Sequence, residues 1–235
     1  MRTTSSVASL ALILTLLPGA ALAQSGYDSL SDAEIDQRLR FIEERLEGGE
    51  RWSKWWQNGW TGVYVAGIAV GTGQAAATDS GKNRANYLVT AVKGVIGTTR
   101  LLLSPHPGRN GADEIAAVNY GNTREAKIQR LQRGEQILDD VAKRARQRTN
   151  WIPHAANVGL NLVGAGFILG FGHSMDALES FALGVTVGEA HLWSAPKKGI
   201  QDLEDYQTRF GGKTSSRFDW NLVPTVGGAA LHVTF

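Results

Sequence analysis

Five histidines and the acidic residues near them are the side chains in this sequence that could do chemistry. One hypothesis is a metal site built from His173, Asp176 and His191, because imidazole and carboxylate groups are common zinc ligands. The chain has no HExxH sequence or comparable ligand spacing that would support it. The simpler interpretation is that these are polar histidines in loops and at helix ends. The histidines are His106, His154, His173, His191 and His232.

Other catalytic signatures are missing from the sequence. The glycine pair Gly71 and Gly73 lacks the third glycine and the preceding strand of a dinucleotide-binding fingerprint. There is no GxSxG sequence and no Walker A lysine, and residues 104–107, Ser-Pro-His-Pro, predict a rigid turn. With no Cys, the chain can form neither disulfides nor thiolate sites. We therefore expect a non-catalytic protein without a cofactor or a bound metal.

The N-terminal residues 1–23 have the pattern of a secretory signal peptide. Arg2 is followed by the short apolar segment 10–17, and residues 21–23, Ala-Leu-Ala, form a cleavage site before Gln24. Without Arg2 the chain is almost neutral, since 24 Lys and Arg in total oppose 22 Asp and Glu. The charge gives no reason to expect a nucleic-acid partner. We expect a protein exported across the inner membrane of a Gram-negative bacterium, to the periplasm or outer membrane.

The remainder of the chain contains the same helical module twice. Residues 97–105 and 188–196 place Gly, Leu and Pro at matching positions, and the Gly-rich segments 71–74 and 170–173 precede them in the same order. The alternative is two unrelated helical hairpins of similar composition. We predict a mainly α fold with a C-terminal β-hairpin. The predicted divisions are the signal peptide 1–23, helical repeat 1 at 24–107, helical repeat 2 at 108–199, and a short helix with the β-hairpin at 200–235.

Each repeat is expected to begin with an amphipathic helix. In the first, a capping box at residues 31–34 precedes apolar residues at helical spacing, and the glycines at 48–49 predict its end. The second is expected to begin near Thr123. The predicted buried faces are Ile35, Leu39, Ile42 and Leu46 in the first helix, and Ile128, Leu131, Leu138, Val141 and Ala145 in the second.

Basic residues stand beside Trp where each of these helices ends. This combination is typical of a membrane–water boundary, where indole rings and cations meet lipid headgroups. It also fits Trp residues that cover a soluble core and cations that stabilise helix C-termini, so both interpretations are open. The membrane-interface candidates are Arg51, Lys54, Trp55, Trp56, Trp60, Arg146, Arg148 and Trp151.

Two long segments without Asp, Glu, Lys or Arg follow, at residues 55–78 and 149–175. As helices, both are long enough to cross a hydrocarbon layer of roughly 30 Å, although Gly, Thr, Asn and Gln dilute their apolar character. We expect them to contact a membrane; a soluble bundle is the alternative. Glycines at four-residue spacing allow close helix packing. The predicted packing positions are Gly67, Gly71, Gly166 and Gly170.

The second helix of each predicted hairpin carries charges of opposite sign. Lys93 and Arg100 are in the first copy, whereas Asp176, Glu179 and Glu189 are in the second. Buried charges are tolerated when they are paired. We predict that Lys93 or Arg100 pairs with Glu179 or Glu189 across the contact between the copies. The alternative is that both helices present these residues to water.

The tail combines a short amphipathic helix at 200–210 with two strands at 218–224 and 229–235. The residues Leu231, Val233 and Phe235 alternate with polar neighbours. An alternating strand that ends on an aromatic residue resembles the C-terminal strand of bacterial outer-membrane proteins. The resemblance covers this last strand only, and we expect the β-hairpin to pack on the helices or to pair with a sheet edge of another chain.

The sequence therefore favours a non-catalytic, membrane-associated structural or assembly subunit of a multi-protein complex in the cell envelope. The expected partners are membrane lipid and other envelope proteins, with no nucleic acid, and self-association into a homo-oligomer is left open. One alternative is a soluble periplasmic module that binds a lipid-like ligand. The other is a metal-dependent enzyme.

Overall fold

The structure, a computed structural model, describes residues 26–118, 121–171, 174–211, 219–225 and 228–234. The chain divides into two compact units, one of residues 32–216 and one that combines residues 1–31 with 217–235. The predicted signal peptide at 1–23 lies outside the described residues, as do His173 and Phe235. The described chain is mainly helical, as predicted.

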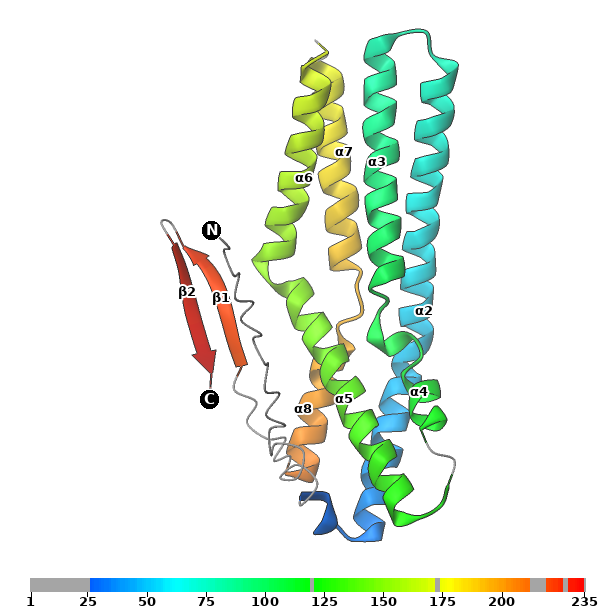
Figure 1. Cartoon of the computed structure of the whole chain (residues 1–235), viewed down its shortest axis with the longest axis vertical. Coiled ribbons are helices and arrows are strands. Elements are labelled where there is room, and N and C mark those ends of the chain that lie inside the picture. The colour runs from blue at the N-terminus through cyan, green and yellow to red at the C-terminus, as the bar shows by residue number, and fades with distance from the viewer. Residues whose placement is uncertain (1–25, 119–120, 172–173, 212–218, 226–227, 235) are drawn as a thin grey trace, which may run out of the picture. The chain divides into compact units, whose positions relative to one another are not determined.

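Helix α2 (Asp32–Ala77) is a single element of 46 residues. The prediction that it ends at the glycines 48–49 was wrong. Each glycine weakens a helix by only about 1 kcal/mol. Buried residues on both sides, including Leu46, Ser53 and Trp56, hold the helix in place through this point. The result is one continuous helix. Its first part packs among other helices near the bottom of Figure 1, and its second part runs beside the helix that follows it in the chain.

Three of the other described α-helices begin at side-chain caps. The side chains of Ser80, Thr123 and Asn150 accept backbone N–H bonds at the starts of α3, α5 and α6, respectively. Gly211, at φ 59°, ends α8 in the left-handed conformation that glycine adopts readily. The helices are α3 (Gly81–Leu103), η1 (Pro107–Arg109), α4 (Gly111–Ala117), α5 (Arg124–Thr149), α6 (Trp151–Leu169), α7 (Ser174–Trp193) and α8 (Lys198–Phe210).

The first part of α2, at residues 32–50, packs with α4, α5 and α8 into what we call the basal bundle (Figure 1). Its centre contains side chains that are fully withdrawn from solvent, such as Ile35, Ile42, Ile115 and Leu131. Both predicted amphipathic faces are confirmed. The buried residues on them are Leu39 and Leu46 of α2, and Ile128, Leu138, Val141 and Ala145 of α5.

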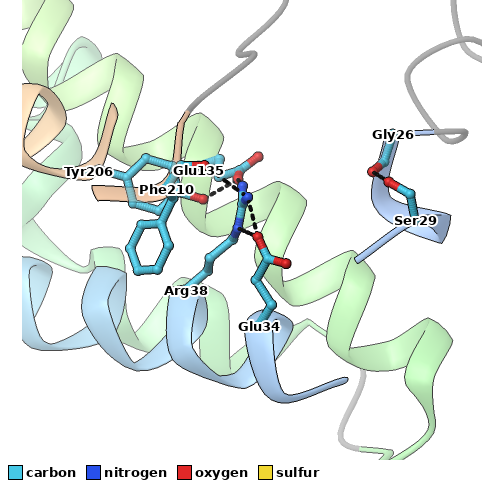
Figure 2. Close-up of polar contacts among 7 residues, drawn as sticks. All are labelled: Gly26, Ser29, Glu34, Arg38, Glu135, Tyr206 and Phe210. Atoms are coloured by element: carbon cyan, nitrogen blue, oxygen red, sulfur yellow. Dashed lines mark hydrogen bonds and ion pairs between the residues drawn. The ribbon is translucent and has the colours of Figure 1, made fainter. Parts of the chain in front are cut away.

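A polar network ties the ends of three basal helices together (Figure 2). The Arg38 guanidinium donates to the Glu34 carboxylate at 2.6 Å and to the carbonyl oxygen of Phe210 at 3.1 Å. The Tyr206 hydroxyl donates to Glu135, whose carboxylate lies 3.8 Å from Arg38. Because Tyr206 is almost fully buried, this hydroxyl needs the partner that α5 supplies.

Two long antiparallel hairpins make up the rest of the helical unit (Figure 1). Hairpin A consists of residues 51–77 of α2 together with α3, and hairpin B consists of α6 and α7. Helix α3 lies against both α6 and α7, so the two hairpins touch along it. All four helices have their base ends at the basal bundle and their far ends at the two hairpin tips (Figure 1).

Glycines allow close approach within both hairpins, to the facing backbone in hairpin A and to asparagine side chains in hairpin B. A Cβ atom on Gly94 or Gly71 would lie 2.7 Å from backbone atoms of the facing helix of hairpin A. The contact line on α2 follows residues 64, 68, 71 and 75, a heptad-like spacing that leaves Gly67 to one side. A Cβ atom on Gly67 or Gly166 would meet no atom within 4 Å, and one on Gly170 would meet only its own helix. The close-packing glycines are therefore Gly71, Gly94, Gly97, Gly164, Gly184 and Gly188.

In the other unit, strands β1 (Asp219–Thr225) and β2 (Gly228–Thr234) pair antiparallel. The register places Trp220 opposite Val233 and Leu222 opposite Leu231. Two of the residues singled out for the terminal strand, Leu231 and Val233, thus belong to β2.

Candidate functional site

The exposed apolar surface of the helical unit is confined to its two hairpins. Among the described residues, every exposed large hydrophobic side chain lies between residues 52 and 103 or between 151 and 193. Examples are Val163, which is 73% exposed, and Leu183, which is 68% exposed. Contiguous apolar surface on this scale marks a site that contacts a partner or a membrane. The basal bundle has no exposed large hydrophobic side chain among its described residues.

Helix α6 is the clearest example of an exposed apolar helix. It is the helix within the described ranges that is long and apolar enough to cross a membrane by length and composition, and 17% of its apolar window is buried. A core helix of a soluble protein would have most of that window buried. Its side chains instead point outward along most of its length.

Several polar side chains of the hairpins bond to neighbouring helices. The Lys93 ammonium of α3 donates to the carbonyl oxygen and hydroxyl of Ser180 in α7, at 3.1 and 3.2 Å. On α6, the Asn157 amide donates to the Val185 carbonyl oxygen and Asn161 donates back to Asn157. Polar groups that face helix neighbours in this way are typical of helices in an apolar surrounding.

The structure does not pair the four charges that were predicted to meet between the copies. Lys93 bonds to Ser180, the residue after Glu179, and Glu179 itself is exposed. Glu189 stays within hairpin B, where it contacts His154 at 2.5 Å. Arg100 is exposed and forms no ion pair with a described residue. The hairpins do meet through α3 and α7, but through hydrogen bonds and small residues rather than through these ion pairs.

The tryptophans at the base of the hairpins divide into two groups. Trp55 and Trp151 are exposed, at 72% and 57%, and face outward together with Trp52 and Trp193. Trp56 and Trp60 face inward, and both indole nitrogens donate to the Ser194 hydroxyl at 3.2 and 3.0 Å. Trp56 and Trp60 therefore pack in the interior, whereas the outward tryptophans remain candidates for contact with a membrane.

The basic candidates are similarly divided. Arg51 and Arg146 are exposed, and Lys54 forms an ion pair with Glu50 one turn earlier. Arg148 is different, because only 8% of it is exposed. Its guanidinium lies 4.5 Å from the centre of the Trp56 ring, a cation–π contact.

Arg148 belongs to a group of cationic and aromatic side chains that we call the junction cluster. Its Nη1 lies 3.3 Å from His191 Nε2, and His191 Nδ1 lies 2.9 Å from the Tyr64 hydroxyl. The His191 ring stacks on Trp56 with 4.8 Å between ring centres. Arg144, one turn before Arg148 on α5, donates to the Ser104 hydroxyl at 2.8 Å. The cluster comprises Trp56, Tyr64, Arg100, Ser104, His106, Arg144, Arg148 and His191.

Burial and the repulsion between positive charges lower the pKa values of side chains in this cluster. Burial, helped by the nearby Arg144 and Arg100 charges, lowers the pKa of Arg148 from 12.5 to about 10. The pKa of His106 falls from 6.5 to about 4, mainly through burial and also through the positive charges of Arg148 and Arg144. His106 is therefore neutral at neutral pH while the guanidinium groups around it stay charged.

The tip of hairpin A is polar. Asp79 is exposed in the tip of hairpin A, and Lys82 is exposed in the first turn of α3. The Arg84 guanidinium donates to the carbonyl oxygens of Ala75 and Thr78 at 3.2 and 2.7 Å, which satisfies the end of α2. In hairpin A, an apolar segment thus lies between a polar tip and the polar basal bundle.

Two cavities lie on the helical unit. The larger, of about 710 Å³, is an open groove lined by charged side chains such as Glu47, Glu50 and Lys54. A second, of about 230 Å³, lies over the basal bundle near Gly49 and Asp202. No group of three His, Asp or Glu within the described residues is arranged to hold a metal ion.

The junction cluster is the functional candidate that sequence reasoning missed. Its sequence signal was the basic run at the end of α5, in which Arg144 and Arg148 share one face at i, i+4 spacing. Nothing in the sequence showed that His106, which follows α3, would lie beside that face. The chain matches no known protein-family model, no curated protein sequence and no solved structure.

Proposed function

We propose that this chain is a non-catalytic cell-envelope protein whose hairpins A and B enter a lipid bilayer while the basal bundle remains in water. In this role it serves as a structural or assembly subunit of an envelope complex, after export with the segment 1–23 as signal peptide. The observation that supports the proposal is the confinement of exposed large hydrophobic side chains to the hairpins. In water, such a surface would drive aggregation.

The helix lengths fit the thickness of a bilayer. Helices α3, α6 and α7 have 23, 19 and 20 residues. At 1.5 Å per residue they extend about 28–35 Å, close to the roughly 30 Å of a hydrocarbon core. The exposed Trp55, Trp151 and Trp193 at the base ends then lie where indole rings prefer the headgroup region.

An internal duplication explains why the two hairpins share their packing. In hairpin A, Gly97 closes on the ring of Tyr64, and in hairpin B Gly188 closes on Asn157. One turn away, Gly94 meets Ile68 as Gly184 meets Asn161. Gly97 and Gly188 stand at matching positions of the repeat, whereas Gly94 and Gly184 differ by one residue; the first pair supports descent from one helical module, followed by a tail with a β-hairpin.

The two rival functions have less support. A soluble module for a lipid-like ligand would need an apolar cavity, whereas the 710 Å³ groove has charged walls. An enzyme built on His191 would have to use an imidazole that already contacts Arg148 and Tyr64. A cation beside the ring also disfavours binding of a metal ion there.

Fractionation of a charge variant tests the proposal. Val163→Lys puts a cation in the middle of the exposed face of α6, which in a bilayer costs about 2.5–3.5 kcal/mol. We expect wild-type protein to remain in the membrane pellet after alkaline carbonate washing and the variant to be lost from it or degraded. Gln37→Lys, at an exposed position of the basal bundle, is the matched control and should behave as wild type. Wild-type protein that is monodisperse in the detergent-free soluble fraction would refute membrane insertion.

A further inference from the structure

Three arginines meet at the junction cluster, where the hairpins join the basal bundle. Arg100 comes from the last turn of α3, whereas Arg144 and Arg148 come from the last two turns of α5. Burial lowers the pKa of both Arg144 and Arg148; the positive charge of Arg100 lowers it further at both, and that of Arg144 adds to the effect at Arg148. The fold thus holds three like charges together, an arrangement that is unfavourable unless an anion offsets it.

The described acidic residues do not supply that anion. Asp140 acts electrostatically on Arg144, but no ion pair joins a carboxylate to Arg100, Arg144 or Arg148 within the described chain. Glu189 is occupied by His154, Asn157 and Trp193. Arg148 is therefore a buried guanidinium without a counter-charge, which is costly.

Two buried hydrogen-bond donors in the cluster lack a partner. His106 Nδ1 accepts the backbone N–H of Gly108 at 3.2 Å, so the neutral ring carries its proton on Nε2. That Nε2 and the Nε of Arg148 are both buried without a hydrogen-bond partner. His106 is 3% exposed and Arg148 is 8% exposed, and the imidazole and the guanidinium both lie against the Trp56 ring. Unsatisfied buried donors beside three cations indicate a site for an oxyanion.

We propose that the junction cluster binds a phosphate oxyanion, which in the membrane is the phosphate of an anionic lipid headgroup. Guanidinium groups bind phosphate through paired N–H donors, and His106 Nε2 supplies a neutral donor. Arg100 is exposed beside Leu102 and Leu103, which are 62% and 82% exposed. A lipid whose phosphate meets Arg100 would thus lay its acyl chains on the apolar face of hairpin A. The phosphate chemistry follows from the cluster alone; the lipid source rests on the proposed function.

The test uses the full chain in neutral detergent and measures the unfolding midpoint Tm with three probes. These are short-chain phosphatidylglycerol, short-chain phosphatidylcholine and inorganic phosphate. At about a hundredfold excess over Kd, we expect phosphatidylglycerol to raise Tm by about 5 °C or more, and phosphatidylcholine by less. The double variant Arg100→Gln with Arg144→Gln should lose at least half of that shift. The matched control, Arg40→Gln with Arg209→Gln, removes two exposed charges of the basal bundle and should keep it.

Each outcome decides between the sources. A shift with phosphatidylglycerol that depends on Arg100 and Arg144 supports a lipid headgroup. A Tm increase that inorganic phosphate causes but phosphatidylglycerol does not, and that the double variant loses, supports the oxyanion site and overturns the lipid source. Equal shifts in the double variant and the control, or no shift with any probe, overturn the site. If the wild-type protein nevertheless stays in the washed membrane pellet, the proposed function stands without this site.

Discussion

A Cβ atom on Gly71 would lie 2.7 Å from the backbone nitrogen of Ala91, so α2 and α3 touch backbone to backbone at this point. Real Cβ atoms do not approach backbone that closely, and backbone in a packed hairpin cannot move aside at low cost. Gly71 is thus a position at which hairpin A does not accept a side chain without backbone movement. Four residues earlier, Gly67 faces open space.

This contrast predicts opposite effects for one substitution at two glycines of α2. Gly71→Ala should lower the free energy of unfolding by about 1–3 kcal/mol through overpacking. Gly67→Ala should raise it by up to about 1 kcal/mol, because alanine favours the helix and meets nothing there. Thermal unfolding in detergent compares the two variants directly. Equal destabilisation by both would show that the contact line on α2 includes Gly67.

Lys93 provides a second prediction, on the charges between the hairpins. Because its ammonium bonds to Ser180 rather than to a carboxylate, Lys93→Ala leaves no buried acid unpaired. We expect a double-mutant cycle of Lys93→Ala with Glu179→Ala to be additive within about 0.5 kcal/mol. A buried ion pair would instead couple the two residues strongly, since loss of one partner costs about 3–5 kcal/mol. Such coupling would mean that the side chains rearrange to meet.

The basal network yields a third prediction. Tyr206→Phe removes the hydroxyl that donates to Glu135 from an almost fully buried position. The expected cost is about 1–2 kcal/mol of unfolding free energy, because the carboxylate loses a buried donor. Tyr87→Phe in α3 is the matched control, since the Tyr87 ring is half-buried and its hydroxyl has no hydrogen bond in the described residues; it should change little. Equal effects of both substitutions would contradict the role of this hydrogen bond.

His106 gives a fourth prediction, on pH. Burial, with the charges of Arg148 and Arg144, lowers its pKa from 6.5 to about 4, so below pH 6.5 the unfolded chain takes up a proton that the folded chain excludes. The stability contributed by the neutral ring is complete above about pH 6.5 and falls by about 3 kcal/mol between pH 6.5 and 4. His106→Asn keeps a cap for Gly108 but cannot titrate. The difference in unfolding free energy between wild type and this variant should follow that decline, and a flat difference would contradict it.

The amphipathic helices were predictable because burial on one face leaves a direct period in the sequence. Ile35, Leu39, Ile42 and Leu46 repeat at helical spacing, and the fold buries that face. The length of α2 was not predictable from the glycines at 48–49, because tertiary packing on both sides overrides a local cost of about 1 kcal/mol per glycine. Local signals decide where a helix begins more reliably than where it ends.

The candidate site was only partly predictable for the same reason. The charge-free segments pointed to the apolar hairpins, and the basic run pointed to the end of α5. Four-residue spacing alone could not say which glycines face a neighbour, so it selected Gly67 as readily as Gly71. The meeting of Arg148 with Arg100 and His106 depends on how three separate segments pack, which no local pattern contains.

Cysteine labelling in sealed membrane vesicles tests the central claim most directly, because the natural chain has no Cys. Single cysteines at Val163, at Asp79 and at Gln37 report on the apolar face of α6, the tip of hairpin A and the basal bundle. A polar maleimide should label Gln37→Cys, and Asp79→Cys once both sides of the membrane are open to it. Val163→Cys should stay unlabelled until detergent is added. Rapid labelling of Val163→Cys in intact vesicles would show that the apolar face of α6 lies in water and would contradict membrane insertion.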